Sequence, residues 1–72
     1  MKSRTGRNPE IGKRIHTIRR ERGLLQEDVA HLVGMSTTVL SRLERGKQSV
    51  SAERLAAIAK ILAVSADYLL GL

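Results

Sequence analysis

The most constraining feature of this sequence is a series of helix start and stop signals. Apolar residues recur at helical spacing in five separate stretches, and glycines and serines stand at the junctions between them. No stretch alternates apolar and polar residues with the period of two that a strand requires. The chain is therefore expected to fold as an all-α domain of five short helices with short connections and no internal repeat.

The same signals predict where each helix begins and ends. The first helix should start with Asn8 as its N-cap and Pro9 in its first turn, and end at Gly23. The second should run from about Gln26 to Gly34. The last three helices are expected to start directly after serine N-caps, namely Ser36, Ser51 and Ser65.

Chain length and composition exclude several kinds of stabilising site. The chain has 72 residues, enough for one small domain, and contains no Cys and only two His. Neither a disulfide framework nor a structural zinc site is expected, and no cofactor is predicted. Stability must come from packed helices or from self-association. With one aromatic residue, the chain is not typical of modules that stack single-stranded bases.

Positive charge is concentrated at the start of the chain. The net charge is +6, and residues 1–22 account for all of it, because they hold eight Lys and Arg against two Glu. A polyanion is the expected partner, with duplex DNA and an anionic membrane both open at this point. No stretch has the length and apolar character of a membrane span or signal peptide, so a cytoplasmic protein is expected.

The charge pattern also suggests two parts to the chain. Residues 1–8, with no apolar residue after Met1, are expected to form a flexible basic arm, and residues 9–71 the folded domain. Basic arms enter the minor groove in several DNA-binding families. A solvated tail is the alternative interpretation.

Residues 26–43 satisfy an unusually tight set of constraints. Two helices joined through Gly34-Met35-Ser36 need a small residue where their backbones approach, and Ala30 supplies it. Gly34 adopts the positive φ of the turn without steric strain. This spacing predicts a helix-turn-helix, whose second helix fits the major groove of duplex DNA.

Motifs before, within and after this segment form a wider pattern. They are Ile11-Gly-Lys-Arg-Ile15, Arg19 with Gly23-Leu24, Gln26-Glu-Asp-Val-Ala30, Val33-Gly34-Met35-Ser36, Leu40-Ser-Arg-Leu43-Glu44-Arg-Gly46, Leu55, Ile58-Ala59 and Leu69-Leu70. In this pattern the chain resembles the phage-repressor and Cro-type helix-turn-helix regulators over residues 9–71. The resemblance implies a lambda-repressor-like five-helix domain that binds double-stranded DNA as a homodimer on a near-palindromic operator.

Two positions depart from the family pattern. Leu25 stands where the family commonly has Ser or Thr before the glutamine of the second helix. A leucine side chain cannot cap that helix. Val50 stands where the family often has Pro. Neither change affects the positions that would face the groove.

The outer face of the third helix is the candidate reading surface. A polar solvent face is common on amphipathic helices, but within a helix-turn-helix groove contact is favoured. The resemblance implies base contacts there, and an arginine can bond O6 and N7 of guanine together. The residues of this face are Thr37, Thr38, Ser41, Arg42 and Arg45, with Arg42 the candidate guanine reader.

Three further residues are expected to position the DNA. Gln26 lies at the start of the second helix, where free amides favour a phosphate, and the resemblance implies that it also supports the first residue of the third helix. Lys47 and Gln48 match the loop that contacts the backbone of the same half-site in the family. A solvated loop is the alternative interpretation.

Two charged residues fall on inward-facing positions. Arg19 continues the apolar stripe of the first helix, and Glu44 lies on the inward side of the third, so they are expected to form a structural ion pair. The two histidines, His16 and His31, lie off the apolar stripes. They are expected on the surface, without a metal.

Three apolar residues remain after the core positions are assigned. Ile61, Val64 and Tyr68 are expected to form a homodimer contact, although single apolar residues on a surface are also ordinary.

Other functional classes explain less of the sequence. No nucleophile with a base, carboxylate pair or metal-ligand set stands at a recognisable spacing, so no enzyme activity or small-molecule substrate is predicted. A membrane-surface protein would leave the helix-turn-helix spacing unexplained. A repressor-like transcriptional regulator is the favoured function. The alternatives are an antitoxin with a protein partner and a restriction-modification controller.

Overall fold

The computed structural model describes residues 9–72, so the predicted arm and the Asn8 cap lie outside the described residues. Every helix starts where the sequence predicts, and no strand is present among residues 9–72. The all-α, five-helix prediction is therefore confirmed. The helices are α1 (Pro9–Glu21), α2 (Gln26–Val33), α3 (Thr37–Glu44), α4 (Ala52–Leu62) and α5 (Ala66–Leu70).

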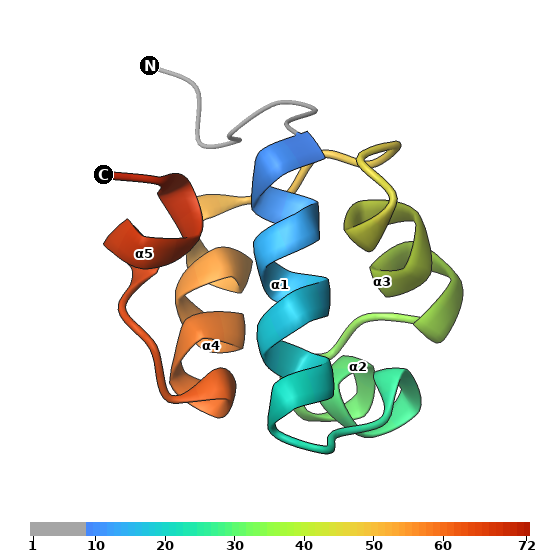
Figure 1. Ribbon diagram of the computed structural model, residues 1–72. Helices are drawn as coiled ribbons and strands as arrows, with labels where there is room; N and C mark the ends of the chain where they lie inside the picture. The colour runs from blue at the N-terminus through green and yellow to red at the C-terminus, as the bar shows by residue number, and fades with distance from the viewer. Residues whose placement is uncertain (1–8) are drawn as a thin grey trace.

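Helix α1 runs through the middle of the molecule (Figure 1). Helices α4 and α5 lie on one side of it, α3 lies on the other, and α2 lies below α3 in this view. Helix α1 packs against α3, α4 and α5, while α2 packs against α3 and α4. The helix-turn-helix formed by α2 and α3 is thus held between α1 and α4.

Three of the helices begin with the predicted serine caps. The hydroxyl oxygens of Ser36, Ser51 and Ser65 accept hydrogen bonds from the backbone amides of Val39, Arg54 and Tyr68 at 3.1, 3.2 and 3.0 Å. Helix α2 is different, because Leu25 precedes it and provides no side-chain cap. The first-turn amides of α2 consequently have no capping side chain.

All five helices contribute aliphatic side chains to one core. Val50, at the position where the sequence departs from the family pattern, is also buried and extends this core into the connection between α3 and α4. Val33 and Met35, which stand before and within the turn between α2 and α3, are partly buried and pack against the core. The largest fully buried side chains are Ile11, Ile15, Val29, Leu40, Leu43, Leu55, Ile58, Leu62 and Leu69.

Helices α1 and α3 approach each other most closely at Gly12. A Cβ atom at this position would overlap the carbonyl oxygen of Leu43 and lie 2.9 Å from that of Glu44. Both obstacles are backbone atoms, which cannot rotate away as a flexible side chain can. The sequence does not indicate this requirement, since no turn signal stands near Gly12.

Candidate nucleic-acid interface

The turn between α2 and α3 has the predicted geometry. Gly34 ends α2 with φ of 72°, and the amide of Met35 donates to the carbonyl of Ala30 at 2.9 Å. Ser36 then caps α3. Because Ala30 is fully buried, the two helices pack closely at this residue, and α3 is set at a fixed position on the surface.

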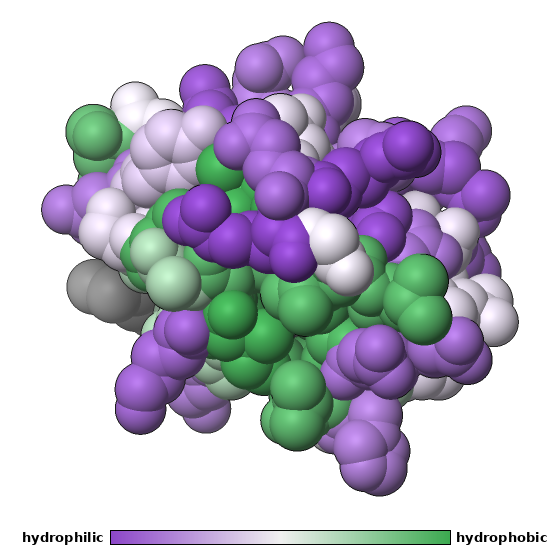
Figure 2. All heavy atoms as spheres, turned by 60° about the horizontal axis from the view of Figure 1, so that its bottom comes forward, coloured by the Kyte–Doolittle hydropathy of each residue, from purple (hydrophilic) through white to green (hydrophobic). Residues whose placement is uncertain are grey.

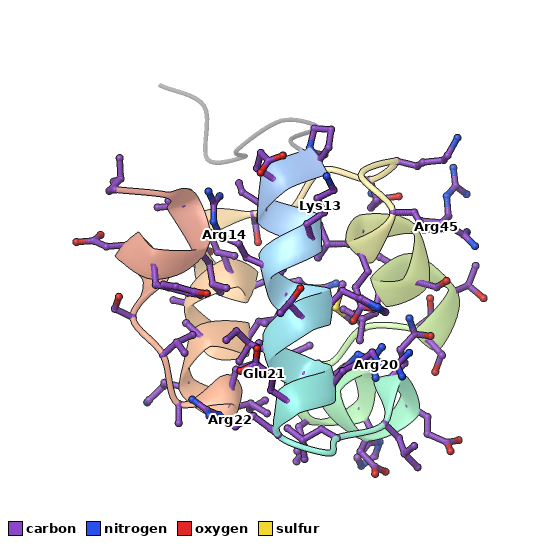
Figure 3. The ribbon with its side chains drawn as sticks, viewed as in Figure 1. Lys13, Arg14, Arg20, Glu21, Arg22 and Arg45 are labelled. Atoms are coloured by element: carbon purple, nitrogen blue, oxygen red, sulfur yellow. The ribbon has the colours of Figure 1, made fainter. Side chains whose placement is uncertain are left out.

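The outer face of α3 is polar and accessible. Thr37, Thr38, Arg42 and Arg45 are exposed, and Ser41 is half-buried. Figure 3 shows the Arg45 side chain extending away from the body of the molecule on the α3 side. The predicted reading residues therefore share one accessible surface. Among them only Ser41 sits partly beneath its neighbours.

An open hollow lies beside this face, at the start of α2. Its lining residues come from three helices and the connection before α2: Arg19, Leu25, Gln26, Glu27 and Thr37. The uncapped first turn of α2 borders this hollow. Arg19 brings a positive charge, Gln26 an amide and Thr37 a hydroxyl, a combination that suits a phosphate.

Glu44 lies at the centre of a buried polar cluster behind the hollow. Its side chain is 2% exposed, and its Oε2 accepts a hydrogen bond from Arg19 Nε at 2.7 Å. Its Oε1 accepts from Arg19 Nη2 at 3.1 Å and from Gln26 Nε2 at 3.0 Å. Arg19 Nη1 also donates to the carbonyl of Leu24 at 2.8 Å. The predicted ion pair between Arg19 and Glu44 is present, and it joins α1, α2 and α3.

The cluster also changes the acidity of Glu44. Burial alone would raise the pKa of this carboxyl, because a charged group is less stable away from water. The hydrogen bonds from its three side-chain partners and the positive charge of Arg19 outweigh that effect and hold the pKa below its ordinary range. No buried side-chain nitrogen or oxygen in residues 9–72 lacks a hydrogen-bond partner.

Two residues make contacts that the sequence did not predict. Gln26 donates a side-chain hydrogen bond to the buried carboxylate of Glu44 and lines the hollow together with Thr37. His16, expected on the surface, is half-buried, and its Nδ1 lies 2.9 Å from Glu44 Oε1. His16 lies three residues before Arg19, about one helical turn back and beside the apolar stripe, so only the inward location of Glu44 could have indicated this contact. His31 is exposed, as expected.

The basic residues of α1 and of the turn that follows it divide between the two sides of this helix (Figure 3). Arg22 Nε donates to the carbonyl of Leu62 at 2.9 Å, and the Arg14 guanidinium lies against Gly71. Both of these side chains belong to the α4–α5 side. Lys13 and Arg20 point toward the α3 side and are exposed. Only part of the positive charge of this helix thus faces the candidate interface.

The connection after α3 forms the other border of the reading face. Lys47 is exposed and Gln48 half-buried. A second hollow separates this connection from α3. Two residues near this hollow were not singled out from the sequence, namely the half-buried Val39 and the exposed Arg54. The residues that line this second hollow are Met35, Val39, Gln48, Ser49, Val50, Ser51 and Arg54.

The predicted dimer residues differ in accessibility. Tyr68 is 46% exposed on α5, whereas Ile61 and Val64 are partly buried and pack against the core. Figure 2 shows apolar side chains gathered at the base of the molecule, where α2 and the end of α4 meet. The exposed Leu32 of α2 belongs to this part of the chain and was not singled out from the sequence.

Residues 9–72 contain neither a group of three side chains placed to hold a metal ion nor a helix suited to crossing a membrane.

Comparison with known proteins places these features among DNA-binding regulators. A family model described as "Helix-turn-helix" matches residues 15–69. An uncharacterized transcriptional regulator in the ATPase CF(0) region of Rhodospirillum rubrum is 41% identical over 58 residues, which cover 81% of this chain and 54% of that protein. The uncharacterized HTH-type transcriptional regulator YazB of Bacillus subtilis is 38% identical over 58 residues, covering 81% and 84%. The chain thus spans about half the length of the first of these relatives.

A solved structure is similar in fold as well as in sequence. The P22 c2 repressor protein in complex with synthetic operator 9T superposes with a TM-score of 0.79 at 32% identity. The match covers 86% of this chain and 94% of the repressor chain.

Proposed function

Since the chain belongs to the helix-turn-helix family of phage-repressor and Cro-like proteins, we propose that it reads duplex DNA through α3 and acts as a repressor-like transcriptional regulator. The observation that carries this proposal is the accessible polar face of α3, held in place by a capped turn and a buried polar cluster. The names of its relatives are those of regulators rather than enzymes. A regulator of this kind acts on chromosomal DNA, so the proposed place of action is the cytoplasm.

The side chains of α3 would have different tasks in the major groove. Arg42 has a planar guanidinium that can bond O6 and N7 of guanine, a contact worth about 1–3 kcal/mol of discrimination. Thr37 and Thr38 offer methyl groups to thymine and hydroxyls to either base edge. Ser41 lies one turn and Arg45 two turns further along the same face. Arg45, at the end of α3, is better placed for the backbone at the groove edge.

Phosphate contacts would flank α3 on both sides. On one side, the hollow that holds Arg19 and Gln26 would receive a phosphate at the uncapped start of α2. On the other side, Lys47 and Gln48 follow α3 and would contact the backbone of the same half-site. Backbone contacts of this kind set orientation, while the α3 side chains select sequence.

We further propose a homodimer on a near-palindromic operator. One helix-turn-helix reads only a few base pairs, so two copies with reading helices about 34 Å apart give useful selectivity. Tyr68 is the exposed member of the proposed contact, and Ile61 and Val64 would contribute their remaining accessible surface. Tyr68→Glu should then weaken binding to a two-half-site duplex much more than binding to a single half-site.

The proposed function is tested by separating base readers from phosphate contacts. A duplex selected from random sequence by the protein serves as the operator, and mixed-sequence duplex serves as the reference. Arg42→Ala should reduce the preference for the selected duplex by about tenfold or more, whereas Lys47→Ala should weaken both complexes alike. Equal losses for Arg42→Ala on both duplexes would remove its assignment as a base reader.

Salt dependence provides the matching test for the phosphate contacts. The logarithm of the binding constant should fall with the logarithm of salt concentration, with a slope of about −0.9 for each phosphate neutralised. A slope near zero, or no selected sequence at all, would contradict the proposed function.

A further inference from the structure

The second hollow, between α3 and the connection that leads to α4, has walls of two kinds. Met35, Val39 and Val50 form its apolar part, and Gln48 and Arg54 contribute polar groups. Arg54 is the charged residue of this lining. An apolar wall beside one positive charge matches the sugar–phosphate unit of a DNA strand, in which a deoxyribose adjoins an anionic phosphate.

The guanidinium of Arg54 is not engaged elsewhere in the fold. Arg54 lies in the first turn of α4 and is exposed. Its backbone amide donates to the hydroxyl of Ser51 at 3.2 Å, which fixes the point where the side chain leaves the helix. Within residues 9–72 the guanidinium itself forms no hydrogen bond or ion pair. Its five N–H donors are therefore available to a ligand.

The two hollows lie at opposite edges of the outer face of α3. Thr37 lines the hollow at the start of α2, and Val39 lines the second hollow. Successive residues of an α-helix are about 100° apart around its axis, so Thr37 and Val39 are separated by about 200°, with Thr38 between them. Arg42, one turn after Thr38, also lies between the two edges. The face proposed to read bases thus has a hollow with an arginine on each side.

Duplex DNA presents a matching arrangement. The major groove is bounded by the backbones of both strands, so a helix that lies in it has one strand on each side. The proposed function places a phosphate in the hollow that Arg19 and Gln26 line. The hollow at the opposite edge of α3 then faces the other strand. Lys47 and Gln48 belong to the connection at this edge, so Arg54 would share a strand with them.

We propose that Arg54 binds a backbone phosphate on the strand opposite to the one at the start of α2, with the adjoining deoxyribose against Val39 and Met35. This inference rests on the proposed function and adds a contact from a helix outside the helix-turn-helix. Phosphate contacts set the orientation of a protein on the duplex. Contacts to both strands therefore hold α3 against tilting in the groove.

Helix α4 supplies its own matched control. Lys60 is exposed in the last turn of this helix and lines neither hollow. Arg54→Ala and Lys60→Ala each remove one positive charge from α4, so they reduce the general attraction to DNA alike. Arg54→Lys keeps the charge at the proposed contact. Both positions are exposed, so all three variants should fold, and circular dichroism checks this.

The first experiment measures the salt dependence of binding to a duplex that holds one half-site of the selected sequence. One half-site excludes any effect of a dimer contact. Arg54→Ala should make the slope of the logarithm of the binding constant against the logarithm of salt concentration shallower by about 0.9, the value for one phosphate. Lys60→Ala should leave the slope unchanged, and Arg54→Lys should restore it.

The second experiment locates the phosphate. Single phosphates of the same duplex are replaced in turn by methylphosphonates, which carry no charge. The replacement at the phosphate bound by Arg54 should weaken binding of wild type but not weaken Arg54→Ala any further, because the two changes remove the same contact. Gln26→Ala should identify the phosphate at the start of α2 in the same way. The two phosphates should lie on different strands.

The outcomes separate this inference from the proposed function. A wild-type protein that binds no duplex contradicts the proposed function itself. Equal slopes for Arg54→Ala and Lys60→Ala, or a slope that Arg54→Lys does not restore, overturn only the contact of Arg54. The strand assignment is overturned if the phosphates that depend on Arg54 and on Gln26 lie on one strand.

Discussion

The two sides of α1 are built from different chemistry. Toward α4 and α5, the contacts are aliphatic, supplemented by a bond from Arg22 to a helix-end carbonyl. Toward α3, the contacts are a backbone approach at Gly12 and a directional polar cluster around Glu44. Aliphatic packing tolerates small rearrangements, whereas hydrogen-bonded ions hold only one geometry. The side that holds the proposed reading helix, α3, in position is the side that uses polar contacts.

The largest effect is expected at the backbone contact on the α3 side. Gly12→Ala places a Cβ against two carbonyl oxygens of α3, so the helices must move apart. We expect a loss above about 4 kcal/mol, which approaches the whole stability of a domain of this size. Urea unfolding followed by circular dichroism measures it.

Thr17→Ala, at an exposed position of the same helix, is the control and should change stability only slightly. If Gly12→Ala unfolds at the wild-type midpoint, the close approach of α1 and α3 is not required, and the contrast between the two sides of α1 loses one of its supports.

The next effect is expected at the centre of the polar cluster. Glu44→Ala leaves the Arg19 guanidinium, whose side chain is 10% exposed, without its carboxylate. Loss of one partner of a buried ion pair is expected to destabilise the protein by about 3–5 kcal/mol. Thermal unfolding at neutral pH measures the loss, with Glu53→Ala, at an exposed position of α4, as the control. An unchanged melting temperature would mean that the pair contributes nothing to stability.

Much of the fold follows from local signals in the sequence. The serine caps and the glycine at position 34 predicted the helix starts and the turn, because both act within a few residues. The Arg19–Glu44 pair was predictable because two opposite charges on inward faces need each other.

The rest depended on contacts between residues far apart in the chain. The close approach at Gly12 requires the packing of α1 on α3, and an extra bond from His16 requires Glu44 to be buried beside it. Gln26 was correctly placed at the start of α2, but its bond to Glu44 depends on where three helices meet. The DNA contacts of α3 stay a prediction, because they concern a partner rather than the fold.

Acid should weaken the α3 side selectively. The folded-state pKa of Glu44 is lowered, so its contribution is complete above the ordinary glutamate pKa of about 4.3 and is lost as pH falls below it toward the lowered value. The stability difference between wild type and Glu44→Gln should therefore shrink between pH 6 and pH 3. Urea titrations across this range measure it. A difference that stays constant would mean that Glu44 does not titrate with unfolding.

The smallest effect is expected on the apolar side, at the end of α4. Ala63 has a φ of 60°, the left-handed region in which a Cβ is strained, and its amide bonds the carbonyl of Lys60 at 3.1 Å. Ala63→Gly relieves that strain and should stabilise the protein by about 0.5–1 kcal/mol, despite the greater freedom of glycine in the unfolded chain. Ala56→Gly, at an exposed position in the middle of the same helix, should destabilise the protein by a similar amount.

Because neither residue contacts the polar cluster, both variants should bind duplex DNA as wild type does when they are folded. A change in DNA affinity for Ala63→Gly would show that the two sides of α1 are coupled, and the proposed division between them would fail.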